Sequence, residues 1–490
     1  MSDVYMRPAS SVDVFPVEMW REVFAHAVFP PLLPGQNASV FDDIDVFGHP
    51  CKLYSSQLAV RTTLQLVCRL WYEIIKWDKK HGTFFMDTVS ISEILLERVR
   101  LARRLEIINR WASYCCQWPC VLTRRPSGRC PSGTYTSPKY EQNAQGTIYC
   151  PPEASFGAEI LRLLDDNRDA SQLLNGCMNL RALSVRFTGF RLATSGTNFV
   201  QSHLQQLSHL HLDGVQDNGE INVLYLPRLR YLKLTMDLRY GGIGIFPLEI
   251  RMPNINTIVL EGWADSRYRS SIDVLLLSTT HSLINLILTY NGENGHAIFS
   301  LLNLPKFEKL SVFGFGIRNL YRELHREFVA TPLPLSSSSI SFALFGLDTH
   351  NRKDCFRFRK GYVSKLTDIF TRRGEWFSKL VIPLEWSDLQ DLWVQACEKF
   401  DLGDGFSEDD PLPCYWYVLN HVSKSGVPVE DRNGVGMGEG AGAIFTRRME
   451  EYSDSKEYTA KRSHLVRTHC KNWNSWDYRD DWVESDWSYK

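Results

Sequence analysis

Two stretches near the start of the chain carry apolar residues at helical spacing. In the first, Met19, Trp20, Val23 and Phe24 recur every three or four residues, which places them on one face of an α-helix. In the second, the same spacing relates Leu64, Val67, Cys68, Trp71 and Ile74. Neither helix buries such a face alone, so the pattern predicts that the two pack on each other or on a partner.

The ends of these stretches resemble a known motif. The first begins with Phe-Pro-Val-Glu from Phe15, and the second contains Val-Cys-Arg-Leu-Trp from Val67. Both are similar to signatures of the F-box, which attaches a substrate receptor to a cullin–RING ubiquitin ligase. The resemblance implies an F-box over residues 12–91 that binds a Skp-family adaptor and through it the cullin. The adaptor-binding residues that it implies are Pro16, Glu18, Met19, Trp20, Val23, Leu64, Val67, Cys68 and Trp71.

A long segment, residues 28–55, separates the two halves of this module. It contains several residues that interrupt helices, among them Pro30, Pro31, Pro34 and Gly35. Insertions at surface turns cost little free energy. The sequence therefore predicts a surface loop inserted into the helical module.

Residues 92–115 again show helical spacing, with Leu95, Val99, Leu105 and Ile108 among the apolar positions and several arginines between them. This predicts a linking helix, followed by a degenerate first repeat that ends near residue 125. The arginine-rich face is expected to be solvated rather than to bind an acidic partner.

Residues 126–155 are rich in Pro, Gly, Ser and Thr, which predicts a loop. Five cysteines lie in it or just before it, but they form no CxxC pair and have no nearby histidine. Zinc sites need such paired ligands, so no metal is expected here.

Six later segments share the pattern apolar–x–x–apolar–x–apolar. They are Leu180/Leu183/Val185, Leu207/Leu210/Leu212, Leu229/Leu232/Leu234, Ile255/Ile258/Leu260, Leu283/Leu286/Leu288 and Phe307/Leu310/Val312. Their spacing matches that of leucine-rich repeats, about 20 to 29 residues. One strand with its connection cannot bury its own apolar side, so the pattern predicts stacked parallel strands over residues 156–400.

Two further segments of this region read as strands, residues 340–345 and Phe377 to Ile382. The predicted fold class is therefore α/β: an N-terminal helical F-box followed by an irregular leucine-rich-repeat solenoid with short parallel strands. Such repeats commonly follow F-boxes, and the chain looks most like the expanded F-box families of mushroom-forming fungi.

Residues 401–490 change in character. They hold an acidic stretch and a glycine-rich run, Gly434 to Ala443, which predict a linker. The segment from Thr446 onward is compatible with a polar helix. The run contains Gly436-x-Gly438-x-x-Ala441, but no strand is expected before it, so nucleotide binding is not predicted. Four tryptophans in the last twenty residues are expected to dock on the molecule's own surface, or else to form a partner motif.

Composition and charge exclude several classes of partner and compartment for this protein. The formal charge of −1 gives no global field that attracts nucleic acid. Twelve cysteines in 490 residues are too few for a disulfide scaffold. No signal peptide and no long apolar run are evident, so we expect a cytoplasmic or nuclear protein without membrane contact.

No catalytic motif was found, and neither a catalytic residue nor a cofactor is expected. The favoured function is a substrate-recognition subunit whose repeats bind an unidentified protein target. The alternative is a repeat scaffold outside any ligase. A third possibility, an enzyme with an unfamiliar site, would show a deep polar pocket with clustered perturbed titratable groups.

Overall fold

The computed structural model describes residues 16–28, 33–35, 39–47, 50–77, 83–87, 102–108, 156–163, 174, 176–186, 204–213, 223–236, 249–262, 266–289, 306–316, 340–345, 377–391 and 414–453. All structural statements refer to these residues. They form two compact units, Met1–Ser282 and Leu283–Lys490, each of which is described by itself.

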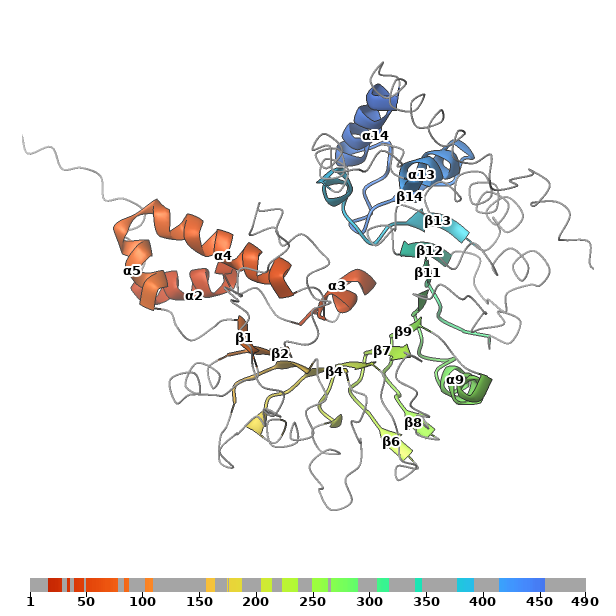
Figure 1. The fold of residues 1–490 in the computed structure, drawn as a ribbon, viewed down its shortest axis with the longest axis horizontal. Helices are drawn as coiled ribbons and strands as arrows, with labels where there is room; N and C mark the ends of the chain where they lie inside the picture. Colours follow the sequence, from red (N-terminus) through yellow and green to blue (C-terminus); the bar gives the residue numbers. More distant parts are fainter. Residues whose placement is uncertain are drawn as a thin grey trace, which may run out of the picture. The chain divides into compact units, whose positions relative to one another are not determined.

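Three helices bring the two predicted helical stretches together (Figure 1). They are α2 (Val17–Val28), α4 (Pro50–Val67) and α5 (Arg69–Trp77). Pro16 precedes α2, and its carbonyl group accepts hydrogen bonds from the N–H groups of Met19 and Trp20. Proline suits a helix start because its missing N–H has no role there. The second predicted helix is divided in two by a break at Cys68.

The prediction of a surface loop over residues 28–55 is wrong for much of the segment. Helix α3 (Val40–Asp45) lies inside it, and α4 already begins at Pro50. Ser39 caps α3: its hydroxyl accepts from the N–H of Asp42, whose carboxylate accepts from the N–H of Ser39. This reciprocal capping box stabilises a helix start. Val40, Phe41 and Asp43 of α3 are buried.

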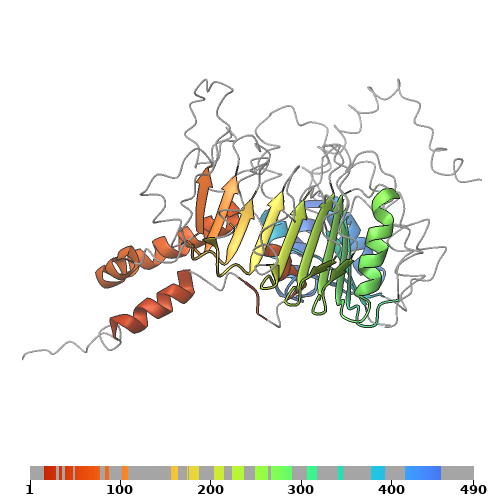
Figure 2. The same ribbon diagram turned by 90° about the horizontal axis from the view of Figure 1, so that it is seen from below.

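The first unit contains a parallel sheet whose strands follow one another in sequence order (Figure 2). Its strands are β1 (Thr83–Asp87), β2 (Arg104–Ile108), β3 (Ile160–Leu163), β4 (Ala182–Arg186), β5 (His209–Asp213), β7 (Tyr231–Met236) and β9 (Thr257–Gly262). Two shorter strands, β6 (Val223–Tyr225) and β8 (Glu249–Arg251), pair separately. Helix α9 (Ser266–Ser278) follows β9.

The apolar motifs of this unit are in register, as the sequence predicts. Leu183 is opposite Leu210, Leu210 is opposite Leu232, and Leu232 is opposite Ile258. All four side chains are buried. The sequence did not identify β3 as a further strand of this stack, although its Leu161 is opposite Leu183.

The linking helix predicted over residues 92–115 is wrong where the structure describes it, because residues 104–108 form strand β2. Leu105 is opposite Leu161 and is completely buried, while Arg104 and Glu106 are buried on the other face. The spacing of Leu101, Leu105 and Ile108 suited a helix. The alternation of charged and apolar residues from Arg104 suits a strand that pairs on both sides, with β1 and with β3.

The second unit contains parallel strands β10 (Asn285–Thr289), β11 (Val312–Gly316), β12 (Ile340–Phe345), β13 (Phe377–Val381) and β14 (Val429–Glu430). Strands β12 and β13 confirm the two late strands expected from the sequence. The sixth motif, however, was misaligned. Leu286 is opposite Phe313, not Leu310, so the motif in register is Leu310/Phe313/Phe315. Phe313 is completely buried, whereas Val312 is partly exposed.

The linker predicted over residues 401–490 is wrong for residues 414–445, which contain α13 (Cys414–Lys424), β14 and the start of α14 (Gly440–Ser453). The rest of α14, as far as Ser453, confirms the helix expected from Thr446. The glycine-rich run is a tight turn: a Cβ placed on Gly442 would lie 2.3 Å from the carbonyl oxygen of Gly436. Asp431 holds this turn by accepting hydrogen bonds of 2.9 Å from the N–H groups of Asn433 and Val435.

A short strand, β14, does precede this turn, contrary to expectation. The side chain of Glu439 lies beside Gly436, so a negative charge stands close to the start of α14, which does not favour a phosphate there. The cysteine-containing loop, the possible repeat at residues 117–125 and the tryptophan-rich tail lie outside the described residues.

Candidate functional site

A cluster of aromatic rings holds the helical module together. Ring centroids of Trp20 and Trp71 are 5.2 Å apart, those of Phe24 and Trp71 are 4.8 Å apart, and those of Trp20 and Phe24 are 5.6 Å apart. Phe24 and Ile74 are buried, and Leu64 packs against them. The resemblance implied that Trp20, Leu64 and Trp71 bind the adaptor; in the structure they are partly buried and pack within the module.

The same three helices also expose much apolar surface. Eight of the thirteen large hydrophobic side chains that are exposed in the described part of the chain belong to them. They are Val17, Met19, Val23, Val60, Leu66, Val67, Leu70 and Tyr72. Leu66 is 81% exposed and Val67 is 54% exposed. Each exposed apolar Å² costs about 25 cal/mol relative to burial, so a concentration of such residues indicates an interaction surface.

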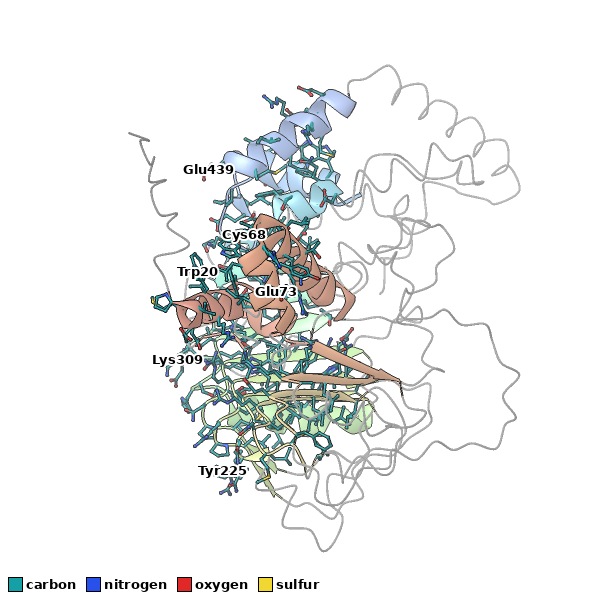
Figure 3. All side chains as sticks on the ribbon, turned by 90° about the vertical axis from the view of Figure 1, so that its left-hand side faces the viewer. Trp20, Cys68, Glu73, Tyr225, Lys309 and Glu439 are labelled. Carbon is teal, nitrogen blue, oxygen red and sulfur yellow. The ribbon has the colours of Figure 1, made fainter. Side chains whose placement is uncertain are left out.

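We call these eight residues the apolar helical surface. Figure 3 shows the side chains of this module, with Trp20, Cys68 and Glu73 labelled. Of the residues implied by the resemblance, Met19, Val23 and Val67 belong to the surface, and Pro16 and Glu18 are also exposed. Cys68 is partly buried, with a free thiol, at the junction of α4 and α5.

Sequence reasoning missed Val17, Val60, Leu66, Leu70 and Tyr72. The sequence did contain a sign of this second exposed side. Leu66 stands two residues after Leu64, so on a helix it points away from the side that carries Leu64 and Trp71. An apolar residue off the main stripe of an amphipathic helix indicates a second contact surface. Sequence alone did not show which stripe would be turned toward solvent.

A polar region lies on the sheet of the first unit, on the face opposite Leu183, Leu210 and Leu232. Here the Ser184 hydroxyl and His211 Nδ1 are 2.9 Å apart, and His211 Nε2 lies 3.1 Å from the Thr235 hydroxyl. That hydroxyl donates to Glu261 at 3.4 Å. Because the Thr235 hydroxyl gives its one proton to Glu261, it accepts from His211 Nε2. The chain of bonds links β4, β5, β7 and β9.

Helix α3 and the residues after it cover part of this polar face. Asp43 Oδ1 is 3.0 Å from His209 Nε2 and 3.7 Å from Arg230 Nη2. Arg104 Nη1 donates to the carbonyl oxygen of Val46 at 3.1 Å. The predicted inserted loop is therefore in contact with β2, β5 and the start of β7.

Tyr231 is completely buried beneath this contact. Burial raises the pKa of its hydroxyl group well above the ordinary value of 10.0, and the negative charges of Glu261, Asp43 and Asp45 raise this pKa further. The hydroxyl group makes no hydrogen bond. Tyr231 is therefore neutral at physiological pH and carries an unused donor.

A depression of about 450 Å3 lies at the starts of several strands of the first unit. It is lined by Arg103, Glu159, Asn179, Arg181, Gln206 and Arg228. Its carboxylate, Glu159, pairs with Arg103 at 2.8 Å. A paired carboxylate among arginines offers neither a nucleophile nor a free general base, so this site does not favour catalysis.

Within the described residues, no group of three or more His, Cys, Asp or Glu side chains is arranged to hold a metal ion. Over the same residues, no helix has the length and apolar character needed to cross a membrane. No family model matches this chain, and no curated protein sequence matches it.

Proposed function

We propose that this chain is the substrate-recognition subunit of a cullin–RING ubiquitin ligase of the SCF type. The apolar helical surface binds a Skp-family adaptor, and the stacked parallel strands bind a protein target. The observation that carries the proposal is the exposure of Met19, Val23 and Val67, beside the two signatures that resemble the F-box.

The chain contributes proximity rather than bond chemistry. Tethering a target beside the ubiquitin-charged enzyme raises the effective concentration of its lysines to about the millimolar range. Rigid helices orient that tether, and the ring cluster of Trp20, Phe24 and Trp71 gives this module its rigidity.

The proposal is tested by measuring the affinity of the purified full-length chain for a Skp-family adaptor by isothermal titration calorimetry. The variant carries Leu66→Asp and Val67→Asp, at the two most exposed positions of the apolar helical surface. We expect the affinity to fall at least about tenfold, since burying a charge without a partner costs more than about 1.4 kcal/mol. Trp20 is left unchanged because it packs inside the module.

The matched control is Leu277→Asp, which places the same charge on α9 at a residue that is 60% exposed. We expect this variant to bind the adaptor like the wild type, and both variants to keep the wild-type melting temperature. Wild-type affinity in the folded Leu66→Asp, Val67→Asp variant would refute the assigned surface. A wild-type chain that binds no adaptor would favour the alternative, a repeat scaffold outside any ligase.

A further inference from the structure

The segment formed by residues 39–47, here called the α3 segment, lies on the polar face of β2, β5 and β7. We propose that this face is a binding site for a short acidic and aromatic peptide, and that the α3 segment occupies it as an internal stand-in for that ligand. The inference rests on the proposed function only in identifying the ligand as part of a target protein.

The first support is charge complementarity. Asp43 is 4% exposed, and its carboxylate lies 3.0 Å from His209 Nε2 and 3.7 Å from Arg230 Nη2. Two other carboxylates of this face have partners on the strands themselves: Glu106 pairs with Arg104, and Glu261 pairs with Lys233. Removing the α3 segment therefore leaves the His209 and Arg230 donors facing an open surface, which is an arrangement that binds a carboxylate.

The second support is recognition of peptide backbone. Arg104 donates to the carbonyl oxygen of Val46 at 3.1 Å, and Arg230 donates to that of Gly35, which precedes the α3 segment, at 3.0 Å. The bond to Val46 does not depend on the side chain of the residue that accepts it. Another peptide that follows the path of the α3 segment can therefore accept this bond, whatever its sequence at that position.

The third support is an aromatic contact. The ring of Phe47 has its centroid 5.9 Å from that of His211 and 6.3 Å from that of Tyr231. Phe47 and Phe41 are both buried. Aromatic anchors that flank a central carboxylate give a peptide both affinity and direction on the face.

The fourth support is that the α3 segment fits incompletely. The Tyr231 hydroxyl is completely buried and makes no hydrogen bond, and the Nε of Arg230 is also buried without a partner. A ligand that offers acceptors to these two groups forms bonds that the α3 segment does not form. Such a ligand has a free-energy advantage over the internal occupant, which is what displacement requires.

The α3 segment is also short enough, and placed so, that another peptide can replace it on the strand face. Helix α3 has 6 residues, too few for a stable helix without contacts. The segment lies between α2 and α4, so it can leave the strand face while α2 keeps its contacts with α5 through Trp20, Phe24 and Trp71, and with α4 through Leu64. We therefore infer a self-occluded site that a target must open.

The test uses a fluorescently labelled peptide with the sequence of residues 39–47, SVFDDIDVF, and measures its anisotropy with the full-length chain. The opened variant carries Asp43→Ala and Phe47→Ala, which weaken the internal occupant. We expect it to bind the peptide about tenfold more tightly than the wild type, since the peptide no longer competes with a tethered copy. Adding Arg230→Ala to the opened variant should abolish binding.

Asp273→Asn on α9 is the matched control, which should bind the peptide as weakly as the wild type does. Equal affinity of the wild type and the opened variant would overturn the inference, as would equal binding of a scrambled peptide. Adaptor affinity is measured on the same variants and should not change, so failure of this site is distinguishable from failure of the proposed function.

A second measurement does not depend on how the opened variant folds. Excess peptide is added to the wild-type chain, and amide hydrogen exchange is followed over residues 40–46. We expect faster exchange in this range, because the peptide displaces α3 and exposes its N–H groups. Unchanged exchange at a peptide concentration that saturates the anisotropy change with the wild-type chain would contradict the inference.

Discussion

Neighbouring apolar residues of one helix can have different roles: one packs inside the module and the next is exposed to a partner. Trp20 and Met19 are neighbours in α2, yet Trp20 packs against Trp71 while Met19 is half exposed. The sequence identified both because helical spacing places them on one broad face. It did not separate them, since that requires the position of α5, which is set by contacts distant in sequence.

Tyr231 gives a prediction at this scale. Replacing Tyr231 by Phe should leave the free energy of unfolding at neutral pH unchanged or raise it by up to about 1–3 kcal/mol, because the buried hydroxyl makes no hydrogen bond. The pKa of Tyr231 is raised in the folded state, mainly by burial, so the unfolded state loses this proton first as the pH rises above 10.0. The wild type should therefore lose stability above that pH, and the variant should lose less.

Urea unfolding at neutral and at alkaline pH checks this prediction. Tyr225→Phe is the control, because Tyr225 is 44% exposed. A wild type and a Tyr231→Phe variant that lose equal stability at alkaline pH would show that the folded protein ionises Tyr231 as readily as the unfolded chain does.

Among the helices and strands, the apolar motifs predicted the parallel strands well but not every boundary. Strands β4, β5, β7 and β9 are aligned through the expected residues because each strand needs one buried face. Strand β2 was missed because Leu101, Leu105 and Ile108 also suit a helix. Helix α3 was missed because the prolines around it outweighed the capping signal at Ser39 and Asp42.

The first residues of α14 pack closely against the turn before this helix, and this packing predicts the effect of a mutation at Gly442. A methyl group on Gly442 would lie 2.3 Å from the Gly436 carbonyl oxygen and 2.9 Å from Trp386 Nε1. Trp386 donates from this nitrogen to the carbonyl oxygen of Val435, so neither neighbour moves without losing contacts. Gly442→Ala should destabilise the second unit by about 1 kcal/mol or more, since overpacking costs about 1–3 kcal/mol and outweighs the helix propensity of alanine.

Gly438→Ala, in the turn just before α14, is the control, because nothing lies within 4 Å of a Cβ at that position. Thermal unfolding of both variants tests the packing of the turn. A melting temperature for Gly442→Ala equal to that of Gly438→Ala would mean that the glycine-rich run is looser than the structure shows.

The molecule as a whole combines an apolar helical surface with a stack of parallel strands. The sequence predicted the helices that carry this surface and the stacked strands, because each follows from a periodic pattern of apolar residues. It did not predict which side chains of the helices are exposed. It did not predict that the insert between α2 and α4 lies on the strands. That contact joins Asp43 to His209 and Arg230, and no local pattern relates residues so far apart in the chain.

The most direct test of the account is an amide hydrogen-exchange footprint of the full-length chain with and without a Skp-family adaptor. We expect the adaptor to slow exchange over residues 17–24 and 59–72, which carry the apolar helical surface, and to leave residues 209–213 and 231–236 unchanged. Slower exchange in the strands alone, with no change in the helices, would contradict the claim that this surface binds the adaptor.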